Sequence, residues 1–129
     1  MADPLVIIDT SDVRAGRLED VKAAFSHLAA FVEGREPRAA VYHVYFSDDG
    51  SRVTVLQVHP DAASAEAHMV IAAGEFAGFA DLLTLRTLDV YGRPSAGLLE
   101  RLRAKARMLG EAKLVVHEPH AGFLRLRGT

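Results

Sequence analysis

Hydrophobic and polar positions along the chain repeat with periods that change at well-marked turns. Residues 5–8 form a short apolar run and residues 9–12 are polar, which predicts a strand that ends in a turn. Between residues 14 and 33 the apolar positions recur every three or four residues, as on one face of an amphipathic helix. These positions are Leu18, Val21, Phe25, Leu28 and Val32.

A hairpin, a second helix and a fourth strand are predicted next. Residues 40–47 and 52–59 flank Asp48-Asp49-Gly50-Ser51, and an Asp-Gly step between two apolar runs is a strong hairpin signal. The spacing of apolar residues then predicts a helix over residues 62–83 and a strand over residues 85–91.

The order strand, helix, strand, strand, helix, strand is typical of the α+β, ferredoxin-like βαββαβ fold, in which two helices cover one face of an antiparallel sheet. We predict a single domain with this core at residues 1–92 and a C-terminal extension at residues 93–129. The extension is expected to contain a helix over residues 95–109 and two short strands at residues 113–117 and 123–127.

Both faces of the predicted hairpin are largely apolar. One face holds Tyr42, Val44, Phe46, Val53, Val55, Gln57 and His59, and the other holds Val41, His43, Tyr45, Thr54, Leu56 and Val58. Two helices cover only one face of a sheet, and large exposed apolar patches are uncommon on monomers. We therefore predict a homodimer formed through the sheet. The alternative is that the extension covers the second face within one chain.

Composition narrows the class of protein. Half of the 129 residues are hydrophobic and a quarter are charged, as in a globular domain. The net charge of −2 leaves no basic excess, so we expect no nucleic-acid partner. No apolar run approaches the ~20 residues of a membrane span, so we expect no membrane association and a cytoplasmic location. The absence of cysteine excludes disulfides, thiolate metal sites and a cysteine nucleophile.

Several chemistry-bearing side chains are predicted to converge between the helices and the sheet. The candidate catalytic residues are His68, His59 and Tyr42, and the candidate substrate-binding residues are Gln57, Phe76 and Phe79. A phenol, an amide and two imidazoles suit an aromatic ligand, and an imidazole can accept a phenolic proton near neutral pH. The structural alternatives are a hydrogen bond from His68 to a backbone carbonyl and a strand-end role for His59.

The remaining histidines and the basic residues have simpler interpretations. His43 and Tyr45 are expected to hydrogen-bond between chains in the dimer interface. The segment His117-Glu118-Pro119-His120 resembles a metal motif, but proline prevents the helical geometry of such motifs, so we expect a reverse turn and no bound metal. Arg101, Arg103, Lys105 and Arg107 are expected to form a solvated helix face.

The segment Val55-Leu56-Gln57-Val58-His59-Pro60-Asp61 and the following residues 62–69 resemble the signature of the antibiotic-biosynthesis monooxygenase-like family. The resemblance covers about the first 92 residues and implies a small dimeric α+β barrel. Ala67-His68 matches an Ala-His pair of that family at the same spacing. Gln57 and His59 stand where the family typically has an acidic residue and an aromatic residue, often Trp.

The chain departs from the family in one further respect, because it contains neither Asn nor Trp. Relatives that oxygenate polycyclic phenols without a cofactor have pockets lined by Asn, Trp, Tyr and Arg, and haem-degrading relatives use Asn, Trp and His. Neither set is intact here. The resemblance implies a modified cofactor-independent monooxygenase that acts on a small aromatic or quinol-type molecule and needs no cofactor. The alternative is a non-catalytic small-molecule-binding or structural dimer of the same fold.

Overall fold

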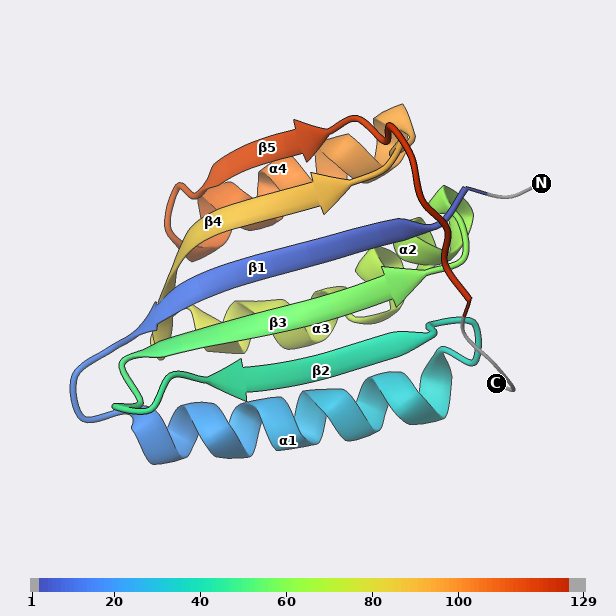
Figure 1. Cartoon of the computed structure of the whole chain (residues 1–129). Helices are drawn as coiled ribbons and strands as arrows, with labels where there is room; N and C mark the ends of the chain where they lie inside the picture. Colours follow the sequence, from blue (N-terminus) through green and yellow to red (C-terminus); the bar gives the residue numbers. More distant parts are fainter. Residues whose placement is uncertain (1–2, 126–129) are drawn as a thin grey trace.

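The structure is a computed structural model that describes residues 3–125, and it contains one five-stranded sheet with its helices on one face (Figure 1). The strand order is β2-β3-β1-β4-β5. The elements are β1 (Leu5–Val13), α1 (Leu18–Arg35), β2 (Val41–Phe46), β3 (Arg52–His59), α2 (Ala62–Ile71), α3 (Ala73–Phe76), η1 (Ala77–Phe79), β4 (Leu83–Tyr91), α4 (Ala96–Leu109) and β5 (Lys113–His117). The predicted α+β, ferredoxin-like core is confirmed, and the described sheet stays open, with β2 and β5 at its edges.

Strand β1 is longer than the sequence pattern predicts. Residues 9–12, expected to form a turn, continue the strand and pair with both β3 and β4. Asp9 and Ser11 lie on the same face of β1 as Leu5 and Ile7. This face meets the helices, and both polar residues are buried there. The prediction of a turn was wrong because polarity does not end a strand when another element supplies a partner for the buried group.

The connection from β3 to β4 is not the single helix predicted over residues 62–83. It consists of α2, the short α3 and the 3₁₀ turn η1, and β4 begins where the helix was expected to end. Gly74 and Gly78 lie in this region, and glycine has a low helix propensity. The broken path still turns Phe76 and Phe79 into the core, where both are buried.

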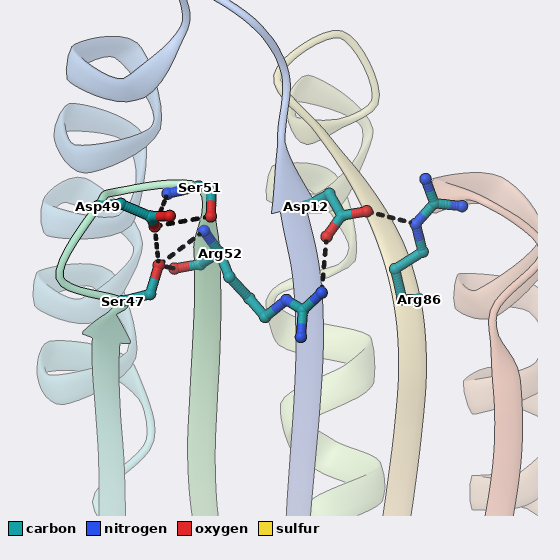
Figure 2. Close-up of polar contacts among 6 residues, drawn as sticks. All are labelled: Asp12, Ser47, Asp49, Ser51, Arg52 and Arg86. Carbon is teal, nitrogen blue, oxygen red and sulfur yellow. Dashed lines mark hydrogen bonds and ion pairs between the residues drawn. The ribbon is translucent and has the colours of Figure 1, made fainter.

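The β2–β3 hairpin forms in the predicted register. Its helix-facing pairs are Tyr42–Gln57, Val44–Val55 and Phe46–Val53. In the turn, Asp49 Oδ1 accepts hydrogen bonds from the backbone N–H of Ser51 at 3.0 Å, from Ser51 Oγ at 2.7 Å and from Ser47 Oγ at 2.9 Å (Figure 2). These hydrogen bonds lower the pKa of the Asp49 carboxyl to about 2, and the bonds from Ser51 have the largest effect. The turn therefore fixes which side of β2 faces the helices.

The outer face, defined as the face of the sheet opposite the helices, carries an ionic cluster at one end. Asp12 of β1 lies between Arg52 of β3 and Arg86 of β4 (Figure 2). Arg86 Nε donates to Asp12 Oδ2 at 2.6 Å, and a guanidinium nitrogen of Arg52 lies 3.5 Å from Oδ1. The hydrogen bond from Arg86 is the main reason that the pKa of Asp12 lies below its ordinary value. The cluster thus connects three neighbouring strands.

The C-terminal extension enlarges the sheet instead of forming a hairpin. β5 pairs in parallel with β4 at the sheet edge, and α4 packs beside α2 on the helical face. The strand predicted over residues 123–127 is absent at residues 123–125, and residues 126–127 lie outside the described part. Residues 118–125 cross only one end of the outer face (Figure 1). Most of that face is therefore left without cover by the described chain.

Among residues 3–125, none of the helices combines the length and the hydrophobicity that a membrane crossing requires.

Candidate active site

His68 and Glu36 form a buried pair between the helices and the sheet. His68 lies on α2 and is 1% exposed, and Glu36 caps the C-terminal end of α1 and is 7% exposed. His68 Nδ1 lies 2.8 Å from Glu36 Oε1 and 2.9 Å from Oε2. A carboxylate can only accept, so Nδ1 carries the proton and donates it. The structural alternative of a backbone carbonyl partner for His68 was wrong, because the partner is a carboxylate.

The second nitrogen of His68 has no hydrogen-bond partner among the described residues, although it is fully buried. The ring lies close to three other rings, with centroid distances of 5.7 Å to Tyr42, 5.6 Å to His59 and 6.0 Å to Phe76. With its proton on Nδ1, neutral His68 presents an unshared electron pair at Nε2. The arrangement therefore offers a base in a largely apolar setting.

His59 is a fully buried neighbour of this pair. Its Nε2 lies 3.0 Å from Gln57 Oε1, an acceptor, so Nε2 carries the proton and Nδ1 is left without a partner in the part of the chain that is described. Burial, aided by the positive charge available at His68, lowers the pKa of His59 from 6.5 to about 4. His59 is therefore neutral at pH 7 and is a weak base.

Tyr42 completes the polar side of the site from β2. Burial is the main cause that raises the pKa of its phenol well above the ordinary value, and the carboxylates of Asp9 and Glu36 act in the same direction. The phenol therefore stays protonated at any physiological pH. Tyr42 can donate a hydrogen bond but cannot serve as a base.

A small cavity with a volume of about 20 Å³ is lined by Tyr42 and Phe76, two of the rings beside His68, whereas His68 and His59 are not among its lining residues. That space holds about one water-sized molecule. Its walls are mostly apolar and include both predicted phenylalanines, together with three polar side chains and Tyr42. The lining residues are Asp9, Ser11, Phe25, Leu28, Tyr42, Val55, Phe76, Phe79, Leu83, Leu85, Lys105 and Leu109. The cavity as it stands does not accommodate an aromatic ring.

Two open grooves run along the outside of the site, between α1 and β2. They have volumes of about 490 and 700 Å³. Tyr42 lines both grooves as well as the cavity, and Phe25 lines the cavity and the smaller groove. These two side chains are therefore shared between the wall of the cavity and the wall of a groove.

A buried ion pair is part of the wall of the cavity and was missed by sequence reasoning. Lys105 Nζ is 3.3 Å from Asp9 Oδ2, and both side chains are nearly inaccessible to solvent. Lys105 was expected on the solvated face of its helix, and that expectation was wrong. It follows Leu102 by three positions and precedes Leu109 by four, so it belongs to the apolar stripe of α4.

Glu36 was also missed, and the sequence carries no comparable signal for it. It lies 32 positions before His68 and directly after the end of a helix, where an exposed carboxylate is ordinary. Only the tertiary structure, in which α1 packs beside β2 and the residue after α1 reaches α2, brings it to the imidazole.

The other histidine candidates lie away from this site. His117 of β5 hydrogen-bonds to Asp89 Oδ1 at 2.9 Å and stacks on Tyr91 at 4.3 Å between ring centroids. His43 and Tyr45 are neighbours on the outer face, with centroids 5.5 Å apart. The described residues contain no group of three or more side chains placed to hold a metal ion.

No protein-family model and no curated protein sequence matches the chain. Solved structures share its fold. MupZ from Pseudomonas fluorescens is 21% identical with a TM-score of 0.69, over 97% of this chain and 91% of that one. SnoaB from Streptomyces nogalater, a cofactor-independent oxygenase, is 15% identical with a TM-score of 0.62, over 74% of this chain and 97% of that one. A proposed antibiotic biosynthesis monooxygenase from Bacteroides thetaiotaomicron is 19% identical with a TM-score of 0.58, over 67% of this chain and 84% of that one.

These matches confirm the resemblance to antibiotic-biosynthesis monooxygenase-like proteins at the level of the ferredoxin-like fold. The match to MupZ spans nearly the whole chain and so includes most of the C-terminal extension. At these identities the likeness defines the architecture, and the chemistry has to be argued from the side chains of the site.

Proposed function

We propose that this protein is a cofactor-independent monooxygenase that acts on a small aromatic or quinol-type molecule, with His68 as its general base. One observation carries the proposal: a buried imidazole is bound through Nδ1 to the Glu36 carboxylate, and its Nε2 has no hydrogen-bond partner among residues 3–125. Buried nitrogen atoms are normally hydrogen-bonded, so an unpaired one has the properties of a group that awaits a substrate, and the His68 ring lies beside Tyr42 and Phe76, two residues that line the cavity.

Glu36 makes His68 suitable for this role in two ways. It holds the tautomer in which Nδ1 is protonated, so the unshared pair is at Nε2. It also stabilises the imidazolium that forms when Nε2 takes a proton, as the third member of a hydrolase triad does for its histidine. The proposed reaction begins with transfer of a phenolic proton to Nε2.

The following steps need only the substrate anion and dioxygen. The anion transfers electrons to dioxygen, one oxygen atom bonds to a ring carbon, and the second oxygen atom leaves as water together with two hydrogen atoms of the substrate. A phenol thereby becomes a quinone, and the four electrons that reduce dioxygen all come from the substrate. In this proposal Tyr42 donates a hydrogen bond to the anion and Phe76 and Phe79 supply apolar walls, since all three residues line the cavity.

The substrate has to reach His68 past the wall formed by Tyr42 and Phe25. We propose that it enters from the grooves between α1 and β2 and displaces these rings, since both line the cavity and a groove. Gln57 is bound to His59 and lies behind the imidazoles, so its proposed contribution is to orient His59 rather than to touch substrate.

Oxygen uptake with a panel of naphthols and hydroquinones tests the proposal. The wild-type protein should consume dioxygen with at least one member, and His68→Gln should lower the rate at least about 100-fold, as expected for loss of a general base. His27→Gln is the matched control, because His27 forms an exposed pair with Glu75 at 3.7 Å, and its rate should be unchanged. A folded wild-type protein that is inactive with the whole panel would contradict the proposal.

The alternative is a non-catalytic dimer of the same fold. The observation in its favour is the size of the cavity, which has room for about one water-sized molecule. In that case the His68–Glu36 pair stabilises the contact between α1 and α2, and His68→Gln alters stability without any associated activity.

A further inference from the structure

The C-terminal extension contributes a positively charged group to the cavity. Lys105 lies on α4, is 9% exposed and lines the cavity together with Tyr42 and Phe76. Its Nζ lies 3.3 Å from Asp9 Oδ2 and 4.6 Å from the centroid of the Phe76 ring. Neither contact belongs to the ferredoxin-like core alone, because α4 follows that core in the chain.

A buried ammonium is costly, and its charge is retained only where a partner compensates for it. Asp9 is that partner. An ammonium has three N–H donors, and within residues 3–125 the hydrogen bond to Asp9 accounts for one of them. The ring of Phe76 offers its face to the positive charge but accepts no strong hydrogen bond. Lys105 therefore keeps donor capacity at the wall of the cavity.

The charged groups in and beside the cavity indicate which kind of ligand the remaining N–H donors of Lys105 can bind. Asp9 and Lys105 line the cavity as an ion pair, and the pair of Glu36 with neutral His68 lies beside two of the lining rings, Tyr42 and Phe76. Tyr42 and His59 remain neutral. A substrate that gives its proton to His68 leaves an oxygen anion, and Lys105 is the cationic side chain among the residues that line the cavity.

We propose that Lys105 binds the oxygen anion of the substrate, and that the site favours acidic phenols or enols, which it holds as the anion once their proton has moved to His68. This inference rests on the proposed function for the role of His68 as the base. The O–H bond breaks, the proton moves to His68 Nε2, and the electron pair stays on the substrate oxygen. An N–H group of Lys105 donates to that oxygen while Asp9 keeps the ammonium charged. The extension is thereby a part of the site and not an accessory.

Binding of 4-nitrophenol, followed by the visible absorbance of its anion across a pH series, tests this proposal without any turnover. The wild-type protein should bind the phenolate about tenfold more tightly than the phenol, which lowers the apparent pKa of the bound probe by about one unit. Lys105→Met should abolish this preference and Lys105→Arg should keep most of it. Arg103→Met removes an exposed charge from the same helix and should leave the preference unchanged.

A second variant separates this role from a structural one. Lys105→Met leaves Asp9 buried without a partner and destabilises the fold, whereas the double variant Asp9→Asn with Lys105→Met removes both charges. Loss of the phenolate preference in the folded double variant supports the proposal. A double variant with the wild-type preference, or a wild-type protein that binds neither form of the probe, overturns it. If the wild-type protein prefers the phenolate but consumes no oxygen with the naphthols, Lys105 remains an anion site and only the oxygenase chemistry is rejected.

Discussion

The rings of His59 and His68 are both buried, with their centroids 5.6 Å apart, but they have different hydrogen-bond partners. This difference gives them different proposed roles. His68 contacts a carboxylate, which stabilises its protonated form, whereas His59 contacts an amide oxygen, which does not. Within residues 3–125, only His68 combines burial, a charged partner and a ring nitrogen without a hydrogen-bond partner. Among the three candidate catalytic residues we therefore propose His68 as the base, Tyr42 as a donor and His59 as a neutral neighbour.

The lowered pKa of His59 predicts a dependence of stability on pH. Because its pKa is about 4 in the folded protein and 6.5 ordinarily, the unfolded chain binds a proton first as pH falls. The contribution of neutral His59 is fully present above pH 6.5 and is lost between 6.5 and about 4, and it amounts to about 3 kcal/mol. Urea unfolding of wild type and His59→Phe at several pH values checks this. If the two proteins lose stability equally from pH 6.5 to 4, His59 is not the responsible group.

Glu36 gives a prediction that separates hydrogen bonding from charge. Glu36→Ala leaves the buried Nδ1–H of His68 without an acceptor, which costs about 1–3 kcal/mol of unfolding free energy. Glu36→Gln keeps an acceptor oxygen and should cost less, but it removes the charge that stabilises the imidazolium. We expect Glu36→Gln to lower the oxygen-uptake rate at least tenfold in a protein with near-wild-type thermal stability. Equal stability losses in both variants would show that the charge, and not the acceptor, holds His68.

At the scale of elements, the site is assembled from separate parts of the chain. α2 carries His68 and is fixed at its start by Asp61, whose Oδ1 accepts the backbone N–H of Ser64 at 2.8 Å. β2 and β3 contribute Tyr42 and His59, and β1 and α4 contribute the ion pair. Apart from Gln57 and His59, which share β3, the proposed functional groups lie on different elements, so their positions depend on packing between elements.

The packing of α4 can be tested by one truncation in its apolar stripe. Leu102 is 1% exposed and lies one turn before Lys105, so Leu102→Ala should cost about 2–5 kcal/mol through lost burial and a residual cavity. Met108 on the same helix is 44% exposed, and Met108→Ala should change stability by less than about 0.5 kcal/mol. Chemical denaturation gives both values. A small effect of Leu102→Ala would show that α4 is only loosely attached to the core.

For the whole molecule, the main open feature is the outer face. Its apolar residues include Val6, Ile8, Val41, Tyr45 and Leu56, and Tyr45 is 51% exposed. The alternative prediction was that the C-terminal extension covers this face within one chain. Instead, α4 packs on the helical side, and only residues 118–125 cross one end of the outer face. A second copy of the chain is therefore the occupant that we propose.

The prediction is a homodimer formed through the outer face. Sedimentation equilibrium at micromolar concentration should give twice the chain mass of 14.0 kDa. Val41→Asp should dissociate or unfold the dimer, because an unpaired buried charge costs several kcal/mol. Val70→Asp is the matched control, since Val70 is 52% exposed on α2, on the other side of the molecule. A monomeric wild-type protein would refute the prediction.

The local pattern of the sequence determined the core topology and the division of the hairpin into two faces. Strand alternation and helical spacing are properties of consecutive residues, so Tyr42, Gln57 and His59 could be assigned to the helix-facing side directly. The convergence of these residues with His68 followed from the fold class. Two predictions were wrong because a charged residue was assumed to be exposed. Asp9 was expected in a turn and Lys105 on a solvated helix face, but each is buried as the other's ionic partner.

Only the tertiary structure decided which polar groups meet. Asp9 and Lys105 are 96 positions apart, and Glu36 and His68 are 32 apart, so neither pairing is visible in a local window. A buried charge is tolerated only when its partner is present, and the partner is fixed by how α1, α2 and α4 pack on the sheet. The sequence by itself therefore determined the scaffold and the candidate imidazoles, whereas the charges that set their chemistry were decided by contacts between distant segments.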